Sequence, residues 1–191
     1  MKPRLLTIIT LITLSTTIFA QDTESATTKK NTFKANPLGL ILGIGKINYE
    51  RQLGPKSSAQ LGFSFFSYTA DGSGLSGFSL LPEYRFFVNG TAVEGFYIAP
   101  FAKYNSITYE NEGDLTGEDF KAKLNVYRIG AKGGFQWLLG KNENFVIDLA
   151  FGGKYSDFNL KVKEGNDDDF DNENLFEGFT PELSFAIGFV F

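Results

Sequence analysis

Apolar residues recur at every second position over most of the chain after residue 58. A period of two is typical of β-strands whose two faces meet different surroundings. The pattern predicts six strands, each with one face that holds large apolar side chains and no charged residue. In alternate positions, these faces run over 59–65, 78–88, 96–104, 127–137, 145–155 and 183–191.

The second face of these strands carries charged side chains among Gly, Ser and Ala. The charged members are Glu83, Arg85, Lys103, Arg128, Lys132, Asp148, Lys154 and Glu182. A small barrel has a narrow interior, and the face with small residues fits it better than the face with bulky side chains. Outward-pointing aromatic side chains are tolerated in lipid, where a Lys or Arg near the bilayer midplane costs about 2–4 kcal/mol. The pattern therefore favours a transmembrane β-barrel over a soluble sandwich or lipocalin, whose strands also alternate.

Short and long connections alternate between the strands. The short ones are 53–57, the two-residue turn Asn89-Gly90, and 140–143; the long polar ones are 71–76, 111–121 and 161–177. Outer-membrane barrels have short periplasmic turns and long extracellular loops, so the last strand descends and ends in the periplasm. Counting backwards, 46–52 forms a descending strand with Glu50 inward, and 31–41 supplies the ascending first strand.

These strands add up to an all-β, eight-stranded, antiparallel up-and-down transmembrane barrel, since an even number of strands closes the sheet without free edges. The first hairpin has alternatives. Leu38 to Gly45 could extend the first strand or form a packed apolar loop, with Pro37 near a strand end or bulge. We expect bulges at Pro82 and Pro100, because each proline removes a donor from the ladder.

The first twenty residues have the layout of an export signal. Lys2 and Arg4 precede an apolar stretch over 5–19, and Ala20 offers a small residue for cleavage. With five Thr and one Ser in fifteen residues, this stretch is too short and too polar for a comfortable membrane span. We therefore expect a cleaved Sec-type signal peptide over 1–20, a short periplasmic segment over 21–30 and a barrel over 31–191. The location predicted is the outer membrane of a Gram-negative bacterium.

The end of the chain resembles the C-terminal signature of outer-membrane barrels, a terminal Phe with apolar residues at every second position before it. The matching positions are Leu183, Phe185, Ile187, Phe189 and Phe191. The segments 36–38, 49–51, 82–87 and 95–101 resemble a family of small outer-membrane barrel proteins of unknown function, similar to OmpX and the membrane domain of OmpA. This resemblance implies an eight-stranded barrel and recognition by the barrel-assembly machinery, and it implies no reaction.

The inward charges, with Glu50 added, are the most interesting candidate site. They could form a conduction path or a network that fills a narrow lumen. Five cations and four anions nearly cancel, as expected of a closed buried network, so we predict a lumen filled by side chains. Aromatic residues on the outer face are interpreted as an interfacial girdle. They are Tyr84, Tyr104, Tyr127, Trp137 and Tyr155.

Composition removes several kinds of chemistry. The 191 residues include neither His nor Cys, which excludes His-dependent Ser or Cys nucleophiles, Cys/His zinc sites and disulfides. The formal net charge of −4 lacks the basic excess typical of nucleic-acid binding. The acidic run 167–173 does not fit an EF-hand, because Asn172 and Gly178 stand where Gly and Glu are required. We predict no enzyme, no cofactor, no metal site and no nucleic-acid partner.

The function predicted is that of a monomeric integral outer-membrane barrel with a structural or surface-interaction role. The long extracellular loops would carry this role, with outer-membrane lipid, lipopolysaccharide, the assembly machinery and periplasmic chaperones as partners. Two alternatives remain. One is a narrow channel or small-solute transporter, and the other is a secreted lipocalin-like binding protein.

Overall fold

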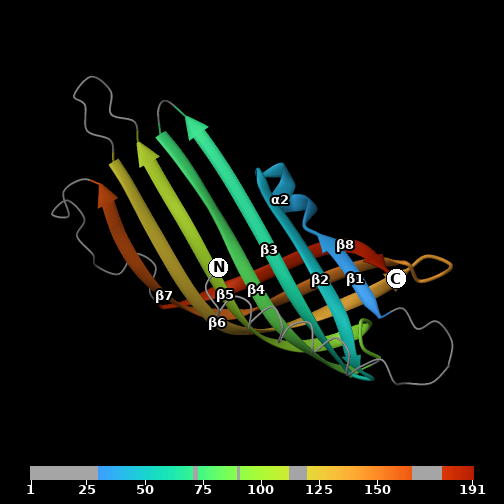
Figure 1. The fold of residues 1–191 in the computed structure, drawn as a ribbon. Coiled ribbons are helices and arrows are strands. Elements are labelled where there is room, and N and C mark those ends of the chain that lie inside the picture. The colour runs from blue at the N-terminus through green and yellow to red at the C-terminus, as the bar shows by residue number, and fades with distance from the viewer. Residues whose placement is uncertain (1–29, 71–72, 90, 112–119, 165–177) are drawn as a thin grey trace, which may run out of the picture.

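The computed structural model describes residues 30–70, 73–89, 91–111, 120–164 and 178–191. Eight strands form a closed antiparallel barrel in which each strand pairs with the next and the first pairs with the last (Figure 1). This confirms the predicted fold class. The elements are β1 (Asn31–Ala35), α2 (Pro37–Ile41), β2 (Ile44–Gly54), β3 (Ser57–Ala70), β4 (Ser73–Asn89), β5 (Gly95–Asn111), β6 (Phe120–Leu139), β7 (Phe145–Glu164) and β8 (Gly178–Val190).

The two ends of the barrel differ, and we name them the turn end and the loop end. The turn end carries the connections at 55–56, 91–94 and 140–144. The first and last strands also meet there: the Asn31 N–H donates to the Phe191 carbonyl at 3.0 Å, and the Phe191 N–H donates to the Asn31 carbonyl at 2.8 Å. The loop end carries the β3–β4, β5–β6 and β7–β8 connections.

Side chains alternate between the two faces of the wall as predicted. On β4, Tyr84 and Phe86 are exposed on the outside, whereas Glu83, Arg85 and Phe87 are buried inside. Because the interior is narrow, small inward residues make room for large ones. A Cβ on the inward Gly134, for example, would lie 2.6 Å from the Tyr97 ring.

Three predicted local features are wrong. The Asn89-Gly90 connection is not a two-residue turn, since β5 begins only at Gly95. The 71–76 connection is not a long loop, because β4 begins at Ser73, which pairs with Ala70. The ladders keep their register through Pro82 and Pro100, and the irregularity between β4 and β5 lies between Phe87 and Asn89 instead.

The first strand is shorter than predicted, because a helical turn replaces its second half. Asn36 caps α2, its Oδ1 accepting from the Gly39 N–H at 2.9 Å, and Pro37 occupies the first helical position, where a missing N–H costs nothing. Gly43 then reverses the chain with φ +73°. The segment 38–45 is therefore neither strand throughout nor a packed loop, since α2 buries none of its residues. Within the described residues, no helix is long and apolar enough to cross a membrane.

Candidate functional site

The lumen next to the turn end is filled by a network of paired charges, here called the neutral cluster. It consists of Lys34, Glu50, Glu83, Arg85, Lys132 and Asp148. All six residues are buried, and three cations face three anions. Such a cluster has no net charge, as a buried ionic network requires if it is not to destabilise the fold.

Lys34 on β1 lies at one side of the neutral cluster. Its Nζ lies 2.7 Å from Glu50 Oε2 on β2, 2.7 Å from Asp148 Oδ2 on β7 and 2.8 Å from Gln136 Oε1 on β6. An ammonium group has three N–H donors, and the three acceptors use them all. Three strands besides β1 are therefore held by one side chain.

Arg85 on β4 spans the lumen from the opposite wall. Its guanidinium contacts Glu83 Oε1 at 2.6 Å through Nε, and Asp148 Oδ2 at 2.7 Å through Nη1. The group also lies 4.3 Å from the centre of the Tyr97 ring, a cation–π contact. Tyr97 in turn donates its hydroxyl to Asp148 Oδ1 at 2.6 Å. Asp148 thus accepts hydrogen bonds from Lys34, Arg85 and Tyr97, which compensate for the burial of its carboxylate.

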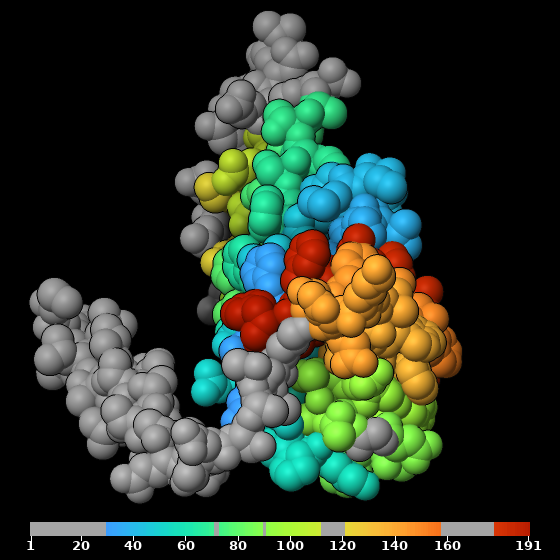
Figure 2. All heavy atoms as spheres, turned by 90° about the vertical axis from the view of Figure 1, so that its right-hand side faces the viewer, coloured from blue at the N-terminus to red at the C-terminus, as the bar shows by residue number. Residues whose placement is uncertain are grey.

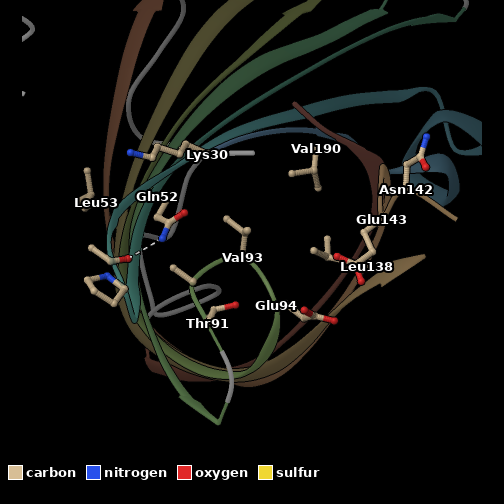
Figure 3. Close-up of a pocket in the computed structure, with 13 residues that line it drawn as sticks. Lys30, Gln52, Leu53, Thr91, Val93, Glu94, Leu138, Asn142, Glu143 and Val190 are labelled. Atoms are coloured by element: carbon tan, nitrogen blue, oxygen red, sulfur yellow. Dashed lines mark hydrogen bonds between the residues drawn. The ribbon is translucent and has the colours of Figure 1, made fainter. Parts of the chain in front are cut away.

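The β4–β5 connection closes the lumen beneath the neutral cluster. Ala92 and Val93 are buried, and the Val93 carbonyl accepts from Gln136 Nε2 at 2.6 Å. Figure 3 shows Val93 inside the ring of strands, and in Figure 2 this connection (green) packs beside the β6–β7 turn (orange). A concavity of about 690 Å³ remains at the mouth, between these turns and the β2–β3 turn. The turn end is therefore plugged by the chain's own backbone and side chains.

Nearer the loop end, the lumen holds a second group, here called the cationic cluster. It consists of Lys46, Lys103, Arg128, Lys154 and Glu182. Lys154 and Glu182 form an ion pair, and Arg128 donates to the neutral side chains of Ser156 at 3.1 Å and Asn105 at 2.5 Å.

Four cations meet one anion in the cationic cluster. Glu182 interacts electrostatically with Lys46, Lys103 and Lys154 at once. Among the described residues, Lys46 and Lys103 have no hydrogen-bonded or ion-paired partner. Cations therefore outnumber anions in this half of the lumen, where Lys46 is attracted also by Glu83 and Asp148 of the neutral cluster.

Comparison with known proteins places the chain in a family. Residues 6–186 match the family described as "Protein of unknown function (DUF3575)". The chain belongs to this family. No curated protein matches it. The crystal structure of CarO from Acinetobacter baumannii is similar, with a TM-score of 0.44 and 12% identity over 85% of this chain and 97% of that one.

In this DUF3575 protein, the nine predicted interior charges lie on the inner face of the wall, but they form two clusters rather than one. The expectation that interior charges nearly cancel is wrong for the described residues. Lys34 and Lys46 raise the count from five cations to seven, against four anions. Both lysines stand at inward positions of the two strands that the turn count had located, so applying the alternation pattern to these strands would have found them.

The remaining predicted features lie outside the two charge clusters. The residues of the C-terminal signature form the outward face of β8 and the chain end, and Phe189, for example, is exposed. The acidic run 167–173 and the signal segment 1–20 lie outside the described residues. In the part of the chain that is described, no three His, Cys, Asp or Glu side chains converge as metal ligands. Tyr97 and Gln136, which complete the neutral cluster, carry no charge and were missed for that reason.

Proposed function

We propose that the protein is an integral outer-membrane β-barrel whose lumen is sealed towards the turn end and whose function is exerted at the loop end. The observation that carries this proposal is the inversion of the usual arrangement: buried ionic side chains fill the centre, and large apolar side chains cover the outside. In water such an arrangement would expose most of the apolar surface that folding normally buries. In a bilayer the same surface meets acyl chains.

The outer face supports a membrane-embedded wall. Every strand carries exposed Phe, Leu or Ile side chains on its outer face. Aromatic side chains also pair on this surface: the ring centres of Phe135 and Trp137 lie 4.6 Å apart, and those of Tyr104 and Tyr127 lie 5.1 Å apart. Tyr and Trp favour the boundary between acyl chains and head groups. A lipocalin-like binder would need the opposite arrangement, with an apolar cavity inside.

The neutral cluster supports a sealed lumen rather than an open pore. Eight strands leave an interior just wide enough for side chains. The Arg85–Asp148 ion pair joins β4 to β7 across it, and the Lys34–Asp148 pair joins β1 to β7 past β8. The plug formed by residues 91–94 adds a second closure. The role is therefore structural or one of surface interaction, with lipopolysaccharide around the loop end, and we expect neither catalysis nor steady ion flow.

Two measurements on the full-length exported protein test this function. Membrane fractionation with a gel shift between unboiled and boiled samples is expected to give a detergent-requiring, heat-modifiable band, whereas recovery in the soluble fraction would overturn the proposal. Planar-bilayer recordings are expected to show no steady conductance. Voltage-stable conductance of porin size would favour the narrow-channel alternative instead.

A further inference from the structure

The barrel wall has a notch on its loop-end side, which follows from the shortness of β1. This strand pairs with β8 only from Thr32–Val190 to Ala35–Ile187. Above that level, no described strand pairs with this edge of β8 over Gly178–Ala186. The facing edge of β2 meets the turn into α2 instead of a strand, since the Asn36 N–H donates to the Lys46 carbonyl at 3.0 Å. The helix α2 lies against both strands at the base of the notch, and Figure 1 shows β3 and β4 extending well past it.

The most exposed large apolar side chains in the described chain flank this notch. They are Ile41 on α2, 81% exposed, and Phe179 and Leu183 on β8, 77% and 71% exposed. Leu42, next to Ile41, is also strongly exposed. The rim of the notch is therefore apolar on the outside.

The inner side of the notch is cationic. Lys46 stands on β2 at one edge and Glu182 on β8 at the other, and the two interact electrostatically across the gap. Lys103 and Arg128 face the same space from β5 and β6. Lys46 is also attracted by Glu83 and Asp148 of the neutral cluster. Because neither Lys46 nor Lys103 has a hydrogen-bonded partner among the described residues, an incoming anion could bind both without breaking an existing hydrogen bond.

We propose that the notch and the cationic cluster together bind a long-chain carboxylate. Its head group lies inside the lumen among Lys46, Lys103 and Arg128, and its alkyl chain leaves through the notch over Ile41 and Leu42. Charge complementarity selects the head group, because two lysines without a partner inside the wall favour an anion. The apolar rim suits an alkyl chain, which passes over it from the lumen into the acyl layer. The site rests on the proposed membrane location, which supplies the acyl layer that the chain enters.

Binding of a fluorescent C18 carboxylate to the purified full-length barrel in non-ionic detergent tests the inference. We expect saturable binding that the double variant Lys46→Met/Lys103→Met weakens at least tenfold. The matched control Lys56→Met/Lys141→Met removes two exposed lysines at the turn end and is expected to leave the affinity unchanged. Neither lysine of the test variant belongs to the neutral cluster. A retained gel shift between unboiled and boiled samples checks that the variant folds.

Competitors separate the two parts of the ligand. An unlabelled C18 carboxylate is expected to displace the probe, whereas a C18 alcohol and 10 mM inorganic phosphate are not. Displacement by the alcohol as efficiently as by the acid would overturn the role of the cationic cluster. Equal displacement by phosphate would overturn the role of the notch.

Photo-crosslinking locates the chain. A C18 carboxylate with a diazirine near its methyl end is expected to label peptides from 36–46 or 178–186. Labelling spread evenly around the outer wall would overturn the inference, as would a double variant that binds as well as the parent. A protein found in the soluble fraction contradicts the proposed function itself, whereas a membrane-embedded barrel without specific binding contradicts only this site.

Discussion

Lys34 on β1 and Asp148 on β7 meet inside the lumen with 2.7 Å between Nζ and Oδ2, although 114 residues separate them in the chain. The two strands are not neighbours, since β8 lies between them in the sheet. This pair therefore reinforces the seam where the barrel closes, at which β1 and β8 share only four paired positions. Closure depends on the interior charges as well as on the backbone ladder.

Replacing Lys34 by methionine is expected to destabilise the barrel strongly. The change keeps most of the side-chain volume but leaves Glu50 and Asp148 buried with one cation fewer. Removing one partner of a buried ion pair costs about 3–5 kcal/mol. The free energy of unfolding, measured by guanidinium titration of the protein in lipid vesicles, checks this. The exposed Lys56→Met serves as control, and a loss no larger than that of the control would contradict a structural role for Lys34.

Tyr97→Phe is expected to lower the free energy of unfolding by about 1–3 kcal/mol, the cost of leaving a buried polar group without one of its partners. The hydroxyl that donates to Asp148 is lost, while the ring keeps its contacts with Phe87 and Arg85. Tyr84→Phe removes a hydroxyl from the exposed outer face and should change the same quantity little. Equal effects of the two variants would mean that the Asp148 contact contributes nothing.

The part of the fold that the sequence predicts rests on the alternation of apolar and polar residues with a period of two. The alternation from Ala59 onwards locates six strands and both faces of each, because outward and inward side chains differ in bulk and charge. Turn alternation then supplies the topology and the first two strands. These features are set by local pattern, and the structure agrees with them.

The failures have a common physical reason, which is competition between local turn signals and contacts distant in sequence. Asn-Gly is a strong two-residue turn signal, but β5 begins only at Gly95, and Ala92 in the connection packs with Phe87 and Tyr97. Likewise, the grouping of interior charges into a neutral and a cationic cluster depends on which strands face each other across the lumen. Spacing along the chain does not contain that information.

Gly188→Ala is expected to disturb the seam. Gly188 on β8 pairs with Lys34, and a Cβ there would lie 1.9 Å from the backbone carbonyl oxygen of Phe33, which requires the first strand to move. We expect the heat-modifiable form to be lost or strongly reduced, together with faster proteolysis near β1. Gly133→Ala is the matched control, since its Cβ would meet nothing closer than 3.5 Å. An intact heat shift in Gly188→Ala would show that the four-residue seam tolerates separation.

A substitution at Phe191 distinguishes a role in assembly from a role in stability. Phe191 closes the seam through its backbone N–H and carbonyl, and its ring is exposed on the outside, so Phe191→Ala should refold in detergent about as completely as the parent. If the assembly machinery recognises the terminal aromatic ring, the same variant should accumulate several-fold less in the outer membrane of cells. Phe179→Ala removes a still more exposed ring from β8, outside the terminal signature, and is expected to assemble normally. The heat-modifiable band is quantified after refolding in detergent and in outer membranes from cells. A refolding defect would make Phe191 a structural residue. Normal accumulation in cells would contradict the prediction that the terminal ring is an assembly signal.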